Sequence, residues 1–208
     1  MLLDHSKQRS HGRLRLPWRT LLLSLLAILA YCLSGPAPEA WVYSRAALHQ
    51  FEWWTLISGH WVHSDLQHAV WNITALLILG GLFEQRLKQR IFVDLLMSSL
   101  LLSLWISCYM PELQAYCGLS GILNTLLVTG TFAVWQQQRS NVPLLILALA
   151  VIKNLVELFS HQAIFTHTLW PSVPEAHLVG MSIGLLIVLT RTAYQRLQMP
   201  ALTAARPG

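Results

Sequence analysis

The distribution of apolar residues constrains this fold more than any other feature of the chain. Six apolar runs, separated by short polar stretches, cover about residues 21–33, 66–83, 91–110, 118–135, 143–160 and 175–191. A helix needs roughly 17–25 predominantly apolar residues to cross a bilayer, and most of these runs have that length. Only 11% of the residues are charged, against about 25% in soluble domains. The predicted fold class is therefore all-α: a polytopic membrane protein with six transmembrane helices in one bundle.

The first apolar run allows two interpretations. Residues 21–33 follow a basic stretch and end at Ser34-Gly35-Pro36, an arrangement that is also typical of a signal peptide. We favour a retained first helix, because a polytopic protein needs no separate signal. The predicted organisation is then a basic cytoplasmic N-terminus at residues 1–19, a membrane domain at 20–191 and a cytoplasmic tail at 192–208.

The positive charges lie on alternate loops. Twelve of the fourteen lysines and arginines follow this pattern: Lys7, Arg9, Arg13, Arg15, Arg19, Arg86, Lys88, Arg90, Arg139, Arg191, Arg196 and Arg206. Cytoplasmic loops of membrane proteins carry such an excess, so we predict both termini in the cytoplasm and residues 36–64, 111–117 and 161–174 outside. A lipid bilayer accounts for this distribution and for the net charge of +5. No nucleic-acid partner is therefore predicted.

Four tryptophans gather in the long outside segment, at positions 41, 53, 54 and 61. Indole rings prefer the headgroup level of a membrane. The segment is therefore predicted to form short helices that lie on the membrane surface. An ordinary folded loop with buried indoles is the alternative, and the two are not exclusive.

A serine between glycines opens the fourth apolar run. The motif Gly118-Leu119-Ser120-Gly121 places Ser120 at a helix N-terminus, where free backbone N–H groups can stabilise a developing oxyanion. A serine hydroxyl is a weak nucleophile and needs an adjacent base. Taken alone, the motif is equally typical of a small-residue packing face in membrane helices.

A histidine in the last run can supply that base. His177 lies near the outer end of residues 175–191, and Gly180 and Gly184 lie on or near its helical face. Such a Gly-x-x-x-Gly pair permits close helix approach, which could bring the imidazole within hydrogen-bonding distance of Ser120. Ionisable residues at membrane depth are costly and are functional-site candidates. The two motifs together predict a hydrolase whose active site lies inside the bilayer.

A third polar cluster, His60-x-x-His63-Ser64-Asp65-x-x-His68-x-x-x-Asn72, begins the second run. His68 and Asn72 share one helical face, where both can donate hydrogen bonds to an oxyanion. A zinc site is the alternative, because histidines and an aspartate cluster here. The histidine spacing does not fit one helix face, and the three cysteines show no metal spacing. No metal or cofactor is therefore predicted, although a disulfide between Cys108 and Cys117 near the outer face is chemically allowed.

These three motifs together resemble the rhomboid family of intramembrane serine proteases. The family carries H-x4-H-x3-N on the second of six helices, G-x-S-G on the fourth and A-H-x-x-G-x-x-x-G on the sixth. Order and spacing agree over about residues 51–190. The matching positions are His63, His68, Asn72, Gly118, Ser120, Gly121, Ala176, His177, Gly180 and Gly184.

The resemblance implies a six-helix rhomboid-like bundle and a role for each matching residue. Ser120 would be the nucleophile and His177 the general base, in a dyad without an acidic third member. His68 and Asn72, with the Ser120 backbone N–H, would form the oxyanion hole. The remaining positions would support the oxyanion site or pack the last helix: Gly118, Gly121, Gly180 and Gly184.

Two positions depart from the family pattern. A Trp-Arg pair is common in the first outside loop of rhomboids, whereas Trp53-Trp54 is followed here by Thr55. The position four after the serine, often an aromatic residue that packs on the catalytic histidine, is Asn124. We therefore expect another group to orient His177.

The compact chain, Gly59-His60-x-x-His63 and Gly-Leu-Ser-Gly look most like the rhombosortase branch of the family. That resemblance implies a bacterial inner-membrane protease that acts on exported proteins anchored by a Gly-rich, hydrophobic and basic C-terminal tail, with residues 161–174 capping the site. Three alternatives stay open. They are acyl transfer to an amine, a catalytically weak or inactive protein that binds membrane segments, and a transporter. In a transporter, Lys153 and Glu157 would form a proton relay instead of a structural ion pair.

Overall fold

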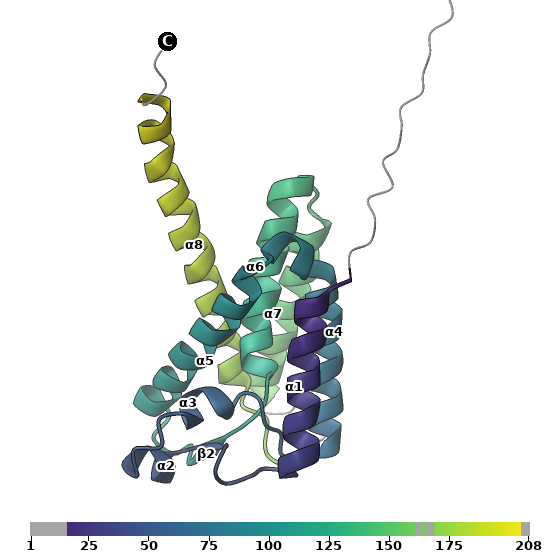
Figure 1. Cartoon of the computed structure of the whole chain (residues 1–208), viewed down its shortest axis with the longest axis vertical. Helices are drawn as coiled ribbons and strands as arrows, with labels where there is room; N and C mark the ends of the chain where they lie inside the picture. Colours follow the sequence, from purple (N-terminus) through teal and green to yellow (C-terminus); the bar gives the residue numbers. More distant parts are fainter. Residues whose placement is uncertain (1–15, 161–163, 165–168, 205–208) are drawn as a thin grey trace, which may run out of the picture.

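Six long helices form the bundle of this protein. We describe residues 16–160, 164 and 169–204 of the chain from a computed structural model, with side chains up to residue 198. The long helices are α1 (Trp18–Ser34), α4 (Leu66–Leu87), α5 (Arg90–Tyr109), α6 (Ser120–Gln138), α7 (Val142–Ser160) and α8 (Pro174–Ala204). Between α1 and α4 lie a short strand, β1 (Tyr43–Ser44), and two short helices, α2 (Arg45–His49) and α3 (Thr55–Ser58), and a second strand, β2 (Ala115–Tyr116), precedes α6. This arrangement confirms the predicted all-α class (Figure 1).

Helix α6 is the centre of the bundle. It packs against α4, α5, α7 and α8, and its apolar side chains Ile122 and Leu126 are fully buried with Leu76 of α4 and Leu102 of α5. Four helices (α4, α5, α7 and α8) are long and apolar enough to cross a membrane on their own. Helix α1 has 17 residues, at the short end of a span. Helix α6 is less apolar than these four helices. The neighbouring helices pack around it and so shield its polar groups from lipid.

Helix α1 is bound to the bundle by a carboxylate. Glu84, buried in α4, accepts hydrogen bonds from the backbone N–H groups of Arg19 (3.2 Å) and Thr20 (2.8 Å) and from Thr20 Oγ1 (2.8 Å). The first N–H groups of a helix lack intrahelical partners, so the carboxylate satisfies them and matches the positive end of the helix dipole. Leu23 and Ala27 of α1 join the apolar core. The first apolar run is therefore an integral element of the bundle.

Residues 36–64, which are predicted to lie outside, fold onto the bundle rather than forming surface helices alone. Strands β1 and β2 pair antiparallel, with Tyr43 opposite Tyr116. The Arg45 guanidinium of α2 donates to carbonyl oxygens at and beyond the end of α5, which are those of Ile106, Ser107, Met110 and Leu113. These bonds satisfy acceptors that a helix C-terminus leaves open. Arg45 thus anchors the segment that lacks the Trp-Arg pair.

The tryptophans of this segment divide between the two predicted environments. Trp41, Trp53 and Trp54 are each more than half exposed, as an indole at a membrane surface would be. Trp61 is half-buried against the apolar core. Figure 1 shows α2, α3 and β2 together at one end of the bundle, while α1 begins and α8 ends at the other.

Helix α8 is longer than the last apolar run. Its apolar stretch was predicted at residues 175–191 with a separate tail from 192, but the helix continues to Ala204 and extends beyond the bundle in Figure 1. Thirty-one helical residues span about 46 Å at 1.5 Å per residue, more than the roughly 30 Å hydrocarbon layer. The described part of residues 192–208 is therefore helical and continues α8, while the predicted boundary between membrane domain and cytoplasmic tail stays a prediction.

Candidate active site

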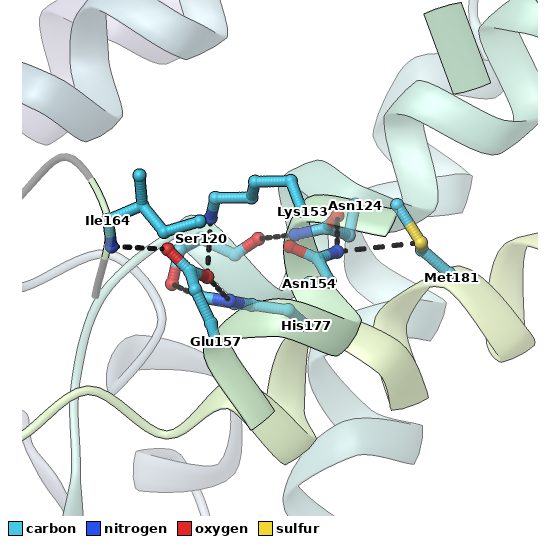
Figure 2. A network of polar contacts seen from close by, with 8 residues as sticks. All are labelled: Ser120, Asn124, Lys153, Asn154, Glu157, Ile164, His177 and Met181. Atoms are coloured by element: carbon cyan, nitrogen blue, oxygen red, sulfur yellow. Dashed lines mark hydrogen bonds and ion pairs between the residues drawn. The ribbon is translucent and has the colours of Figure 1, made fainter. Parts of the chain in front are cut away.

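The structure brings Ser120 and His177 into direct contact. Ser120 is the first residue of α6 and His177 lies in the first turns of α8; the serine Oγ and the imidazole Nε2 are 3.0 Å apart, as Figure 2 shows. Gly118 has φ +111°, a conformation that favours glycine, and it turns the chain from β2 into α6. The nucleophile candidate therefore stands at a helix N-terminus, close to its base.

A close crossing of α6 and α8 makes this contact possible. A methyl group at Gly180 would overlap the carbonyl oxygen of Gly121, and one at Gly184 would come within 2.8 Å of Val128 Cβ. Thr125 Oγ1 donates to the Gly180 carbonyl (2.7 Å) at the same crossing. The predicted Gly-x-x-x-Gly face thus does lie against the serine helix.

The pair opens into a cavity of about 760 Å³ that His68 and Asn72 also line. The Asn72 amide nitrogen is buried and has no hydrogen-bond partner among the described residues. Buried donors without partners are rare in native proteins, so this one is available to a ligand. A side chain at Gly118 would collide with His68 Nε2 and come within 3.2 Å of Asn72 Nδ2. Gly118 therefore lets both donors approach the turn that precedes Ser120.

Ser64 contacts the imidazole of His68, and Asp65 accepts a hydrogen bond from its backbone. Ser64 Oγ lies 3.0 Å from His68 Nδ1 and 2.8 Å from Asp65 Oδ2. Asp65 also caps α4 through its bond from the His68 backbone N–H (2.8 Å). Burial raises the pKa of Asp65, but hydrogen bonds from the His68 and Leu169 N–H groups and from Ser64 outweigh that effect and bring the pKa below its usual value. The carboxylate is therefore ionised at neutral pH.

Neither His60 nor His63 lines the cavity. His60 Nε2 lies 2.9 Å from Ser103 Oγ and 3.1 Å from the Ser99 carbonyl, and the His63 ring packs edge-on against His68. Burial lowers the pKa of His60 to about 4 and that of His63 to about 3. No group of three or more His, Cys, Asp or Glu side chains within the described residues is placed to hold a metal ion.

Glu157 of α7 is the residue that sequence reasoning missed. Its Oε2 lies 3.4 Å from His177 Nδ1 and 2.5 Å from Lys153 Nζ. The predicted pairing with Lys153 exists. The resemblance implied a dyad without an acidic third member, and the structure places a carboxylate beside the histidine of that predicted dyad. A carboxylate in an apolar run is a signal in itself. Only the rotation of α7 against α8 shows which side chain it faces.

Asn124, which departs from the family pattern, takes part in an amide chain. Its Nδ2 donates to the Ser120 carbonyl (2.9 Å), and its Oδ1 accepts from Asn154 Nδ2 of α7 (2.9 Å). Asn154 also contacts Met181 Sδ at 3.5 Å. These bonds tie the first turn of α6 to α7 (Figure 2).

The described part of the α7–α8 connection lies over the cavity. Ile164 N–H donates to Glu157 Oε1 and Leu169 N–H to Asp65 Oδ2, each at 2.9 Å. Trp170, Pro171, Ser172 and Val173 line the cavity. The predicted cap, 161–174, is thus described in part, since residues 161–163 and 165–168 lie outside the described residues.

No cysteine takes part in a disulfide. Cys108 is exposed and Cys117 is buried, and neither they nor Cys32 is bonded. Cys117 lines the cavity, but burial raises the pKa of its thiol to about 12. A thiol that stays protonated is a poor nucleophile, so Ser120 has no competitor from this residue.

Comparison with protein families supports the same region of the chain. Residues 50–194 match the rhomboid domain, and this stretch contains every side chain placed in the cavity above. No individually curated protein matches the chain significantly.

Proposed function

The chain belongs to the rhomboid family, and on that premise we propose that it is an intramembrane serine protease with Ser120 as nucleophile and His177 as general base. The observation that carries the proposal is the 3.0 Å contact between Ser120 Oγ and His177 Nε2 in a cavity with an unpartnered buried amide donor at Asn72.

The geometry supports a two-step acyl-enzyme reaction. His177 Nε2 accepts the Ser120 hydroxyl proton while Oγ attacks the scissile carbonyl carbon, and the imidazolium then gives the proton to the leaving amine. The oxyanion would be bound by Asn72, His68 and the Ser120 backbone N–H at the start of α6. Water, activated by the same histidine, would release the acyl group. Gly118 and Gly121 support this site because a side chain at either would collide with its neighbours.

We propose that the substrates are membrane-anchored proteins. The cavity is lined by residues of β2 and of the first turns of α6 and α8, among them Tyr116, Ser120 and His177, and Figure 1 shows β2 together with α2 and α3 at one end of the bundle. The charge pattern supports an orientation with that end outside and both termini in the cytoplasm, and the resemblance implies a bacterial inner membrane. Helical peptide bonds are shielded, so a substrate span must unwind locally near its outer end. The rhombosortase-like motifs narrow the substrate to the Gly-rich, apolar and basic C-terminal tail of an exported protein.

The catalytic assignment is tested by a fluorophosphonate probe and by cleavage of a membrane-anchored reporter in proteoliposomes. Ser120→Ala should abolish labelling and cleavage. His177→Ala and the double variant with both substitutions should lose nearly as much reporter cleavage as Ser120→Ala, because the two residues act as a unit. Ser182→Ala is the matched control, since Ser182 is an exposed serine of α8 that bonds only its own helix. Labelling that persists in Ser120→Ala, or additive losses, would show that the nucleophile is misassigned.

The substrate assignment needs a separate experiment. Mass spectrometry of exported proteins compares their C-termini in cells with the wild-type chain and with Ser120→Ala. Uncleaved C-terminal tails should accumulate only with the variant. Identical C-termini in both would reject the tail substrates and leave the catalytic assignment untouched.

A further inference from the structure

We propose that Glu157 is a positioning residue for the reaction, which orients His177 from helix α7 and balances the charge that the imidazole gains. The inference rests on the proposed function, because it assigns a partner to the general base. It places the acidic partner on α7, a helix that contributes neither the nucleophile nor the base.

The contacts of the Glu157 carboxylate carry this inference. Oε2 faces His177 Nδ1 at 3.4 Å and Lys153 Nζ at 2.5 Å, and Oε1 accepts from the Ile164 N–H at 2.9 Å. The side chain is only 2% exposed. His177 Nδ1 is itself buried and makes no hydrogen bond among the described residues. The Glu157 carboxylate, whose Oε2 approaches to 3.4 Å, is therefore placed to receive a hydrogen bond from Nδ1 once the two groups move closer.

The chemistry of the base requires such a partner. His177 can accept the serine proton at Nε2 only in the tautomer that carries its proton on Nδ1, and an acceptor at Nδ1 selects that tautomer. When Nε2 is protonated, the ring becomes a cation, and a carboxylate beside it stabilises the charge. A separation of 3.4 Å is long for a hydrogen bond. Catalytic contacts often tighten only in the substrate complex, and Glu157 is in reach to do so.

Lys153 makes this carboxylate tolerable at membrane depth. An isolated ionised group in an apolar helix is expensive, and the adjacent ammonium, four residues earlier on α7, compensates its charge in the resting site. Lys153 also weakens the electrostatic stabilisation that Glu157 gives the imidazolium, because one carboxylate then interacts with two cations. We therefore expect a smaller contribution than that of the aspartate in soluble serine proteases.

The attachment of α7 links the orientation of the base to the position of this helix. Its only two buried residues are Asn154 and Glu157, and both are polar. Asn154 reaches the first turn of α6 through Asn124, and Glu157 reaches His177 (Figure 2). In lipid no hydrophobic effect drives apolar helix faces together, and hydrogen bonds between helices contribute to their association. Displacement of α7 would thus remove the partner of the base.

The test is steady-state kinetics with an anchored reporter in proteoliposomes. Glu157→Leu removes both the acceptor and the charge, and kcat should fall on the order of 10²–10³-fold with KM within about 2-fold of wild type. Glu157→Gln keeps the volume and an acceptor oxygen but loses the charge, so its kcat should fall on the order of 10-fold. Glu157→Asp, which restores the charge on a shorter stem, should exceed Glu157→Leu.

The control separates a positioning role from a structural one. Glu84→Gln also neutralises a buried glutamate, but at the α1 contact, so it should leave kcat within about 2-fold of wild type. If Glu157→Leu fails to fold, Glu157→Gln decides: kcat within 2-fold of wild type would overturn the inference. A rise in KM at unchanged kcat would do so as well. Activity retained in Ser120→Ala would instead overturn the proposed function itself.

Discussion

The crossing of α6 and α8 predicts that a single methyl group disables the site. Gly180→Ala points Cβ at the Gly121 carbonyl oxygen, at a distance that real side chains do not adopt, and within 3.4 Å of Asn124 Cβ. The nearest obstacle is backbone, so no side-chain rotation relieves the overlap. Relief requires the two helices to move apart.

The size of the effect follows from the geometry. The added Cβ starts 2.0 Å from the Gly121 carbonyl oxygen, so restoring normal van der Waals contact needs a displacement of more than about 1 Å. Ser120 Oγ and His177 Nε2, now 3.0 Å apart, would then exceed hydrogen-bonding distance. A misplacement of this size costs about 10²-fold in rate. Overpacking of this kind destabilises by about 1–3 kcal/mol. The Thr125 bond to the Gly180 carbonyl should weaken at the same time.

The matched control is Gly81→Ala in α4. Gly81 has no atom within 4 Å of an added Cβ and is exposed, so the same change should leave both kcat and thermal stability near wild type. Reporter cleavage in proteoliposomes gives kcat, and unfolding in detergent gives stability. If Gly180→Ala cleaved the reporter within a few-fold of Gly81→Ala, the close crossing would not be what positions the base, and the reasoning would be refuted.

Two further predictions concern the oxyanion donors and the buried histidines. Asn72→Ala should lower kcat on the order of 10²–10³-fold, the usual cost of one oxyanion donor, while fluorophosphonate labelling slows but continues; wild-type kcat would exclude the assignment. His60 should make the protein sensitive to acid: burial lowers its pKa from 6.5 to about 4, so the unfolded chain takes up the proton first as pH falls. The stability lost between about pH 6.5 and pH 4 is then on the order of 3 kcal/mol for this group. Thermal unfolding in detergent should show a flatter pH dependence for His60→Gln, and an unchanged slope would count against this origin.

Local sequence patterns predicted the parts of the site that depend on spacing along one helix. His68 and Asn72 share a face of α4, and Gly180 and Gly184 share a face of α8, because residues three or four apart are neighbours on a helix. The approach of His177 to Ser120 followed from the small residues at the crossing. The helices themselves followed from apolar length.

Other parts depend on contacts between distant segments and escaped prediction. Which residue of α7 meets His177 is decided by the rotation of that helix, which an almost uniformly apolar run does not specify. Arg45 anchors residues 36–64 through bonds to carbonyl groups, and because every residue carries a carbonyl group, the sequence does not reveal which ones accept. The extension of α8 past residue 191 was missed because hydropathy ends there, while helix-forming residues such as Gln195, Arg196 and Leu197 continue.

The modest hydropathy of α6 has a consequence for biogenesis. The helix that carries Ser120 is not among those apolar enough to enter a bilayer alone, so its insertion during synthesis depends on α4 and α5, which are made before it and cover it in the bundle. The proposed base lies on α8, which follows α6 in the chain. On the proposed assignment, the nascent chain holds Ser120 without its partner until α8 has inserted, and activity is acquired only after that step.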